Sequence, residues 1–281
     1  MVNLTQMLSQ AKSGRYAVGA FNIYDAESVQ AVVEAAQEER SPVIMITGPM
    51  EVPLLGLKDL TDVCNLLTVR ATIPICLHLD HFTDPESVIR AVEAGFPSVM
   101  IDGSNLSYEE NIRITKHVVD FARPREITVE GELGRIGKAE LSIENGIADE
   151  TTDMEKAKEF VARTGIDALA VNIGNAHGIY RETPKLNFEG LQKIANAVSV
   201  PLVLHGGSST PAPDIQKLVS IGIQKVNVAT ELHAAFSKVL NGDLAIGNGF
   251  TWASSSLQRV KTQQKELIKN WMRLLGSSGR V

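Results

Sequence analysis

The chain has 281 residues, of which 44% are hydrophobic and 21% are charged, and its formal net charge is -6. This composition is typical of a soluble globular protein with a substantial core. The acidic balance gives no electrostatic reason to expect nucleic acid or an anionic membrane as a partner, although a small anionic substrate could still bind at a locally positive site.

Two cysteines, Cys64 and Cys76, occur in neither a CxxC nor a zinc-finger spacing. Cys76 lies within an apolar run and is expected to be a small buried hydrophobic residue. This usage predicts a reducing, cytoplasmic setting. The first residues lack the features of a signal peptide, and no apolar stretch approaches the ~18 residues needed to span a bilayer.

Short apolar runs rich in β-branched residues recur along the chain, each followed by polar residues and then by a helical pattern. Most of these runs are continuously apolar, which is typical of parallel strands buried on both faces. The predicted strands are Ala17–Phe21, Val43–Ile46, Ile75–Leu79, Ser98–Ile101, Thr128–Glu132, Ala168–Ile173, Leu202–Leu204 and Lys225–Val228.

The segments between these strands have apolar residues at helical spacing. Asp25 is the expected N-cap of the first such helix, and Gly95 and Gly222 are expected to end two others. The predicted helices are Ala26–Glu38, Pro85–Ala94, Glu109–Ala122, Asp153–Thr164, Asn187–Val198 and Pro213–Ile221.

Eight strands that alternate with helices predict a single (β/α)8 barrel, a TIM barrel of the α/β class, over residues 1–281. An open nucleotide-binding sheet is less favoured, because no G-x-G-x-x-G turn follows the first strand. Arg135–Thr152 is a long polar connection and a candidate lid. Asn241–Ser256 is a Gly/Ser-rich break before an extra C-terminal helix, Leu257–Leu275, which is expected to pack outside the barrel or against a partner subunit.

Polar residues stand where several of the predicted strands end. Because the C-terminal ends of barrel strands meet at one face, we expect these residues to converge there. Burying acidic and imidazole groups together costs free energy unless a cation or hydrogen bonds satisfy them. The residues are Asp80 and His81 after the third strand, Asp102 after the fourth, Glu132 on the fifth, His177 after the sixth, His205 after the seventh and Asn227 on the eighth.

Three of these residues, His81, His177 and His205, carry imidazoles. Three neutral imidazoles are ligands typical of a first-row metal, with zinc favoured, and they leave a coordination position open for substrate. Asp80 is next to one of them, where it could exchange a proton with a bound substrate.

Asp102 and Glu132 extend this set of polar residues. They could orient the metal ligands, or hold a second or alternate metal position. The alternative is that they cap loops or pair with Arg135.

Glycine-rich segments follow the last three strands. Their backbone N–H groups can approach an anion closely, and the loops after strands seven and eight are the usual phosphate site of such barrels. For Gly206 and Gly207 the alternative is plain turn geometry. The candidate phosphate-binding residues are Gly178, Gly206, Gly207, Ser208, Asn227, Val228, Ala229 and Thr230.

Motifs of a known family run along almost the whole chain: Ala20-Phe21-Asn22-Ile23, Leu77-His78-Leu79-Asp80-His81, 98–104, Glu109-Glu110-Asn111, 131–135, Ala176-His177-Gly178, Pro184-Lys185-Leu186, 205–208 and 225–231. On these motifs the sequence closely resembles the class II, zinc-dependent fructose-bisphosphate and tagatose-bisphosphate aldolases. The TIM barrel is also what this resemblance implies.

The resemblance implies roles for the residues at the metal. His81, His177 and His205 match the zinc ligands, and Asp80 matches the residue that exchanges the proton of the substrate alcohol. Asp102 and Glu132 match acidic positions near an alternate metal position, while His78 has no matching ligand role and is expected to support the site from inside the barrel.

It also implies roles for the loops. The glycine segments match those that bind dihydroxyacetone phosphate, with a monovalent cation (Na⁺ or K⁺) often nearby. Glu140 matches the lid glutamate that handles the proton on the dihydroxyacetone carbon. Asp80, Glu140 and Asn227 are therefore the catalytic candidates.

The activity implied is retro-aldol cleavage of a ketose 1,6-bisphosphate of the tagatose or fructose type to dihydroxyacetone phosphate and glyceraldehyde 3-phosphate. Zinc would stabilise the negative charge that develops on the carbonyl oxygen, so no Schiff-base lysine is needed. Relatives form dimers or tetramers, so a homo-oligomer is expected. Three alternatives stay open: another phosphorylated ketose or deoxy-keto acid as substrate, a metal-dependent phosphosugar epimerase or isomerase, and a non-catalytic accessory barrel subunit.

The sequence departs from the family pattern at a few positions. Phe82 follows the Asp-His pair where glycine is usual, and Ser209 replaces a frequent glycine. The lid sequence Gly137-Lys138-Ala139-Glu140-Leu141 differs from the frequent Gly-Gly-x-Glu-Asp, and the C-terminal region lacks the Asp-Pro-Arg stretch that is common near the final helix of the family. These changes bear on the choice of aldehyde more than on the metal or on dihydroxyacetone phosphate.

Overall fold

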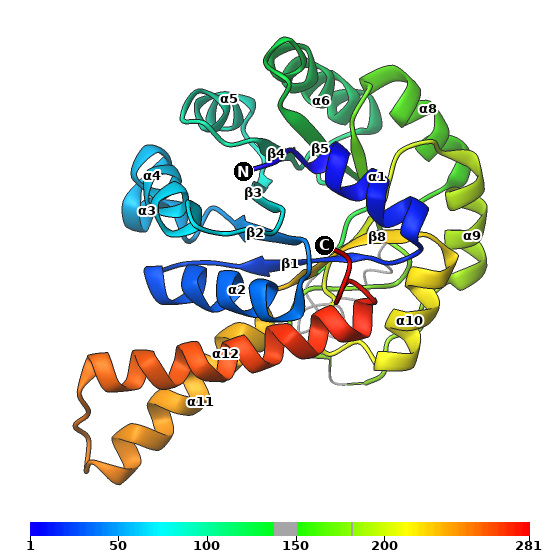
Figure 1. The fold of residues 1–281 in the computed structure, drawn as a ribbon. Coiled ribbons are helices and arrows are strands. Elements are labelled where there is room, and N and C mark those ends of the chain that lie inside the picture. The colour runs from blue at the N-terminus through cyan, green and yellow to red at the C-terminus, as the bar shows by residue number, and fades with distance from the viewer. Residues whose placement is uncertain (138–150, 181) are drawn as a thin grey trace.

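Eight parallel strands close into a barrel in the computed structural model, which describes residues 1–137, 151–180 and 182–281. Each strand pairs with the next, and β1 pairs with β8 (Figure 1). The predicted TIM barrel is therefore confirmed. The strands are β1 (Val18–Asn22), β2 (Val43–Thr47), β3 (Ile75–Phe82), β4 (Ser98–Ile101), β5 (Thr128–Leu133), β6 (Ala168–Val171), β7 (Leu202–Leu204) and β8 (Ile223–Val228).

Helices surround this barrel, and two of the helix-end signals predicted from the sequence are observed. Asp25 and Ser28 form a reciprocal capping box at the start of α2, and Gly222 ends α10. The predicted helices on this ring are α2 (Ala26–Glu39), α5 (Pro85–Glu93), α6 (Tyr108–Ala122), α8 (Met154–Thr164), α9 (Phe188–Ala197) and α10 (Ala212–Ile221).

Further helices were not predicted from the sequence. They are α1 (Leu4–Gly14), α3 (Val52–Leu55), α4 (Leu57–Thr68), the short 3₁₀ turn Arg123–Arg125 and α11 (Thr230–Ile246). The predicted break at Asn241–Ser256 was too long: α11 continues to Ile246, and α12 (Ala253–Leu275) begins earlier than expected. Gly242 lies inside α11, where glycine costs only about 1 kcal/mol relative to alanine.

Two apolar regions form the core. The larger one fills the space between the strands and the surrounding helices. The smaller one lies inside the barrel, where Leu4, Met7 and Leu8 of α1 meet residues such as Val18 and Cys76. Because α1 closes this N-terminal end with apolar side chains, the polar interior residues gather towards the other end.

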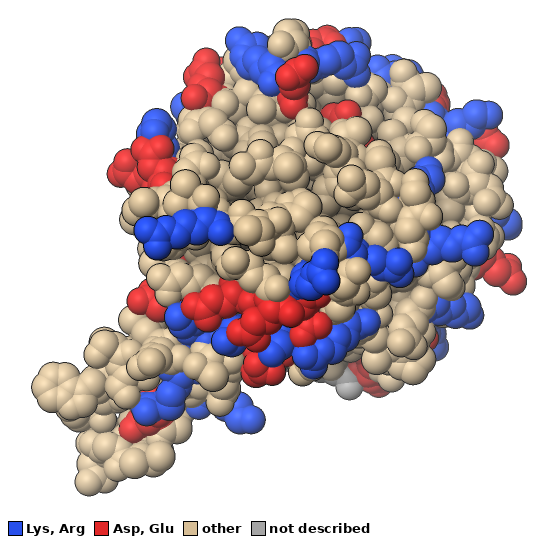
Figure 2. Space-filling model, in the orientation of Figure 1, with Lys and Arg blue, Asp and Glu red and all other residues tan. Residues whose placement is uncertain are grey.

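The C-terminal helices α11 and α12 form a hairpin that projects from the barrel (Figure 1), and the predicted extra C-terminal helix is present. Helix α12 packs along α2. Figure 2 shows acidic and basic side chains interleaved where these two helices meet. The pairs include Lys261 with Glu34, at 2.9 Å, and Lys269 with Glu38, at 2.8 Å.

None of the helices in the described ranges combines the length and the apolar character required to cross a membrane.

Candidate metal centre and active site

The end of β3 is irregular, and this irregularity turns two consecutive side chains towards the barrel mouth. Alternation along a strand places His78 and Asp80 on the same, inner face. The pairing between β3 and β4 then shifts register between Leu79 and Phe82, and His81 adopts a φ of 54°. Such a bulge re-aims the following side chain, so His81 joins Asp80 at the site.

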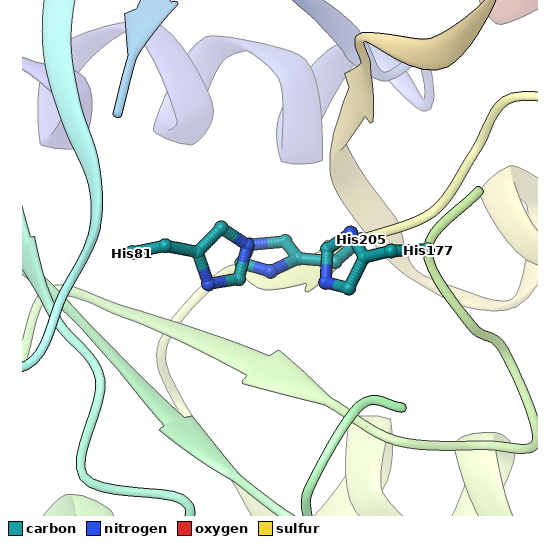
Figure 3. Close-up of side chains that lie close together, drawn as sticks. All are labelled: His81, His177 and His205. Atoms are coloured by element: carbon teal, nitrogen blue, oxygen red, sulfur yellow. The ribbon is translucent and has the colours of Figure 1, made fainter. Parts of the chain in front are cut away.

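The side chains of His81, His177 and His205 converge from three different segments (Figure 3). The ring centroids are 4.8 Å apart for His81 and His177, and 4.5 Å apart for His81 and His205. Ligand atoms from all three rings lie within 4.8 Å of one another. The three predicted metal ligands are thus brought together at the C-terminal end of the barrel.

Two ring nitrogens in this cluster fit a metal ion, because each is buried and has no hydrogen-bond partner among the described residues. They are Nε2 of His81 and Nδ1 of His205. In each ring the other nitrogen is already held: His81 Nδ1 lies 3.1 Å from Asp102 Oδ2, and His205 Nε2 lies 2.9 Å from Glu130 Oε1. A carboxylate behind a ligating histidine fixes its tautomer and ring orientation.

The pKa shifts of His177 and His205 follow from their burial and from the charged groups around them. Burial lowers the pKa of His177 to about 3, and the neighbouring His81 and His205 add to the effect, so His177 presents a neutral ring. Burial alone would also lower the pKa of His205, but the carboxylates of Glu130 and Glu132 raise it to about 10. A cation at Nδ1 would therefore replace a proton there, as metal binding commonly does.

Asp80, on β3, is held in place by Asn227, on β8. The amide Nδ2 of Asn227 donates to both carboxylate oxygens of Asp80, at 3.2 and 3.1 Å. Burial would raise the pKa of Asp80, but nearby His81 and Lys225 lower it overall. Asp80 is therefore an ionised, oriented carboxylate beside the histidine cluster, able to accept a proton.

Asp102 and Glu132 lie beside the same cluster. Together with His81 they form a second group whose ligand atoms lie within 4.8 Å of one another. Glu132 Oε2 is buried without a hydrogen-bond partner in the described chain and lies 3.3 Å from His205 Nδ1. The alternative of loop capping is also observed, because Ser104 N–H donates to Asp102 Oδ1 at 3.0 Å and Ile136 N–H donates to Glu132 Oε1 at 3.4 Å. Neither carboxylate forms an ion pair with Arg135 within the described residues, and each keeps its second oxygen beside the histidines.

Glu130 and Lys225 lie directly beneath the cluster, and the sequence reasoning missed them as site residues. Lys225 Nζ donates to Glu130 Oε2 at 2.7 Å, and both side chains are fully buried. His78, also fully buried, accepts or donates at Ser98 through Nδ1 (2.7 Å), and its Nε2 lies 3.6 Å from Glu130. Burial lowers the pKa of His78 to about 3, consistent with the expected supporting role inside the barrel.

A signal for the missed pair was present in the sequence. Glu130 is two residues before Glu132, and Lys225 is two residues before Asn227. Strand residues two apart share a face. Charged residues within otherwise apolar strands, in phase with residues assigned to the site, should therefore have been placed inside the barrel.

The glycine-rich loops after β6, β7 and β8 touch one another. Gly206 has a φ of 66°, and a Cβ there would lie 2.1 Å from the carbonyl oxygen of Ala176. The N–H of Gly207 donates to Asn227 O at 3.0 Å. Gly178 also has a positive φ, 98°. These close approaches exclude side chains and leave backbone groups facing the mouth.

The predicted anion-binding residues at the end of β8 lie where a helix begins. Val228 ends the strand, Ala229 is the N-cap residue of α11, and Thr230 is its first residue. The N-cap residue itself has no capping side chain, and the N–H of Glu231 donates to Ser208 Oγ at 3.3 Å. The N-terminus of a helix attracts anions through its dipole and its first N–H groups, so the loops and the start of α11 form a candidate phosphate site that includes Ser208. Glu140 lies outside the described residues, and its role stays a prediction.

Comparison with known proteins gives one consistent answer. Residues 2–280 match the family model for class II fructose-bisphosphate aldolase. The YdjI aldolase from Escherichia coli K12 is 35% identical, with a TM-score of 0.86 over 99% of this chain and 98% of that chain. A putative fructose-1,6-bisphosphate aldolase from Coccidioides immitis is 32% identical, with a TM-score of 0.89 over 98% and 96%.

A more distant structure shares the fold. Fructose-bisphosphate aldolase from Campylobacter jejuni is 22% identical, with a TM-score of 0.82 over 98% of this chain and 94% of that chain. The family match over nearly the full length and the two relatives above 30% identity agree with the histidine cluster at the barrel mouth. The chain therefore belongs to the class II fructose-bisphosphate aldolase family.

Proposed function

We propose that the protein is a zinc-dependent aldolase that cleaves a ketose 1,6-bisphosphate of the tagatose or fructose type into dihydroxyacetone phosphate and glyceraldehyde 3-phosphate. The observation that carries the proposal is the convergence of His81, His177 and His205 beside the ionised carboxylate of Asp80. A bound zinc ion would supply electrostatic stabilisation of the negative charge that develops on the carbonyl oxygen.

The residues around the metal have separate tasks in this proposal. Asp80, oriented by Asn227, accepts the hydroxyl proton of the substrate as the carbon–carbon bond breaks, and it returns that proton in the reverse reaction. The loops that contain Gly178, Gly206, Gly207 and Ser208, together with the start of α11, bind the phosphate of the three-carbon fragment. Holding both ends of that fragment positions its reacting carbon.

The direct test is an assay with tagatose and fructose 1,6-bisphosphates in which released dihydroxyacetone phosphate is detected by a coupled reductase. We expect zinc-dependent release of triose phosphate, abolished by a chelator and restored by zinc or cobalt. Turnover without triose release would instead indicate an epimerase or isomerase. Full turnover in metal-free protein would contradict the proposal.

The choice among substrates is tested by the same assay. A panel that adds other phosphorylated ketoses and a phosphorylated deoxy-keto acid should give one substrate with the highest kcat/KM, because specificity is a ratio of these values. We expect a ketose 1,6-bisphosphate to rank first. A bound Na⁺ or K⁺ near the phosphate stays a prediction.

We further propose that the protein is a homodimer or homotetramer that self-associates through the α11–α12 hairpin. Ile246, Phe250 and Trp252 at its tip are 88%, 59% and 73% exposed, and the last two rings pack edge to face at 5.3 Å. Large exposed apolar groups on a projecting element are typical of an interface. The expected mass by light scattering is two or four times 30.4 kDa.

The double variant Phe250→Ser with Trp252→Ser tests this assembly. It should shift the mass towards 30.4 kDa, while Leu66→Ser, another exposed apolar residue (71%) on α4, should not. A wild-type protein that stays at the monomer mass at micromolar concentration would exclude this assembly.

The buried free thiols of Cys64 and Cys76 support the proposal of a cytoplasmic setting.

A further inference from the structure

The carboxylate of Glu231 connects three segments of the chain. It lies in the first turn of α11. Its Oε1 accepts a hydrogen bond from the N–H of Ser209, in the turn after β7, at 2.9 Å. Its Oε2 accepts one from the indole Nε1 of Trp271, on α12, at 2.8 Å. Its own N–H donates to Ser208 Oγ at 3.3 Å.

Ser209 is the strained member of this arrangement. It has a φ of 64°, in the left-handed region that glycine adopts freely and serine does not. A residue held in this region persists only when its surroundings fix it. The hydrogen bond from its N–H to Glu231 is one such constraint, and the bond from Thr210 N to Gly207 O in the same turn is another.

Only a carboxylate can satisfy both partners of this side chain. The Ser209 N–H and the Trp271 N–H are both donors, and a carboxylate offers two acceptor oxygens. Glutamine has the same shape but presents one acceptor and one donor group, so one of the two partners would face another donor.

Trp271 gives this connection a rigid anchor. Its side chain is 6% exposed and belongs to the main core, between Ile268 and Met272 of the same helix, which are also buried. The position of Glu231 is therefore set from α12, and Glu231 in turn holds the turn that follows Gly206 and Gly207.

We propose that Glu231 is a positioning residue for phosphate binding: anchored on Trp271, it holds the Ser208–Ser209 turn in the shape that the phosphate of the substrate requires. This inference rests on the proposed phosphate site at the loops after β7 and β8. It makes the C-terminal helix α12, which lies outside the barrel, a determinant of substrate affinity.

The test compares wild type with Glu231→Gln in zinc-loaded full-length protein. The probe is inorganic phosphate, titrated by calorimetry, together with steady-state kinetics on the best ketose bisphosphate. We expect phosphate to bind about tenfold more weakly, as the loss of a hydrogen bond to a charged group implies. We also expect KM to rise with kcat nearly unchanged, because the phosphate contact is present in the bound substrate and the transition state alike. Zinc content should not change.

Two further variants separate positioning from general damage. Trp271→Phe keeps an aromatic ring in the core but removes the indole donor, and should weaken phosphate binding in the same direction. Adding Ser209→Gly to Glu231→Gln should recover most of the phosphate affinity, because glycine adopts this φ without support. The control is Glu266→Gln, which removes an exposed partner of Lys269 on the same helix and should leave phosphate affinity as in wild type.

The possible failures can be told apart. If Glu231→Gln binds phosphate as tightly as wild type, or if Ser209→Gly brings no recovery, the positioning role is wrong although the phosphate site stands. If wild-type protein binds no phosphate at all, the proposed phosphate site fails and this inference fails with it.

Discussion

Replacing Asp80 with alanine is expected to lower kcat by about 10²–10⁴-fold while zinc remains bound, since positioned general acid–base catalysis contributes roughly that factor. Asp80 is buried and ionised, and both of its carboxylate oxygens accept hydrogen bonds from Asn227, so it is oriented for proton transfer beside the three histidines. Kinetics with the preferred bisphosphate and metal analysis of the same preparation measure the two effects.

The comparison variant is His205→Ala, which should lose both zinc and turnover. His205 is fully buried, its Nδ1 has no partner among the described residues, and its Nε2 is fixed by Glu130. Alanine removes a proposed ligand and leaves Glu130 and Glu132 facing a void. Equal loss of zinc in the two variants would mean that Asp80 acts in the structure of the site and not in proton transfer.

Replacing Lys225 with methionine is expected to destabilise the protein by about 3–5 kcal/mol, which is the usual cost of removing one partner of a buried ion pair. Methionine fills similar space but cannot donate to Glu130, whose carboxylate is fully buried. Burial would raise the pKa of Glu130, and Lys225 and His205 are what lower it. Urea unfolding of the metal-free protein measures the free energy of unfolding without a contribution from zinc.

Two further variants are controls for the stability change of Lys225→Met. Lys116→Met removes an exposed lysine from its i,i+4 pair with Asp120 and should cost well under 1 kcal/mol. The double variant Lys225→Met with Glu130→Gln should recover part of the lost stability, because the buried charge is gone. A loss for Lys225→Met no larger than that for Lys116→Met would show that the buried pair does not stabilise the barrel.

The sequence by itself determined the barrel and the identity of the metal-ligand candidates. Continuous apolar runs, the Asp25 cap and the stop at Gly222 are local signals, because a strand's burial, a capping hydrogen bond or a glycine in an unusual conformation is encoded within a few residues. Since the C-terminal ends of all barrel strands meet at one face, the positions of His81, His177 and His205 after their strands already predict that they converge.

Tertiary structure alone decided how these groups meet. The sequence selects His81 over His78 as a ligand candidate, but only the structure shows how His81 turns into the site, through the register shift between β3 and β4 and its φ of 54°. The ring nitrogens left for the metal are fixed by Asp102 and Glu130, and the lysine that holds Glu130 lies 95 residues further along the chain. Such contacts arise only when the barrel closes, since no local pattern records which buried donor meets which acceptor. For the same reason, only the tertiary structure shows that Glu231 links Trp271 of α12 to the turn at Ser209.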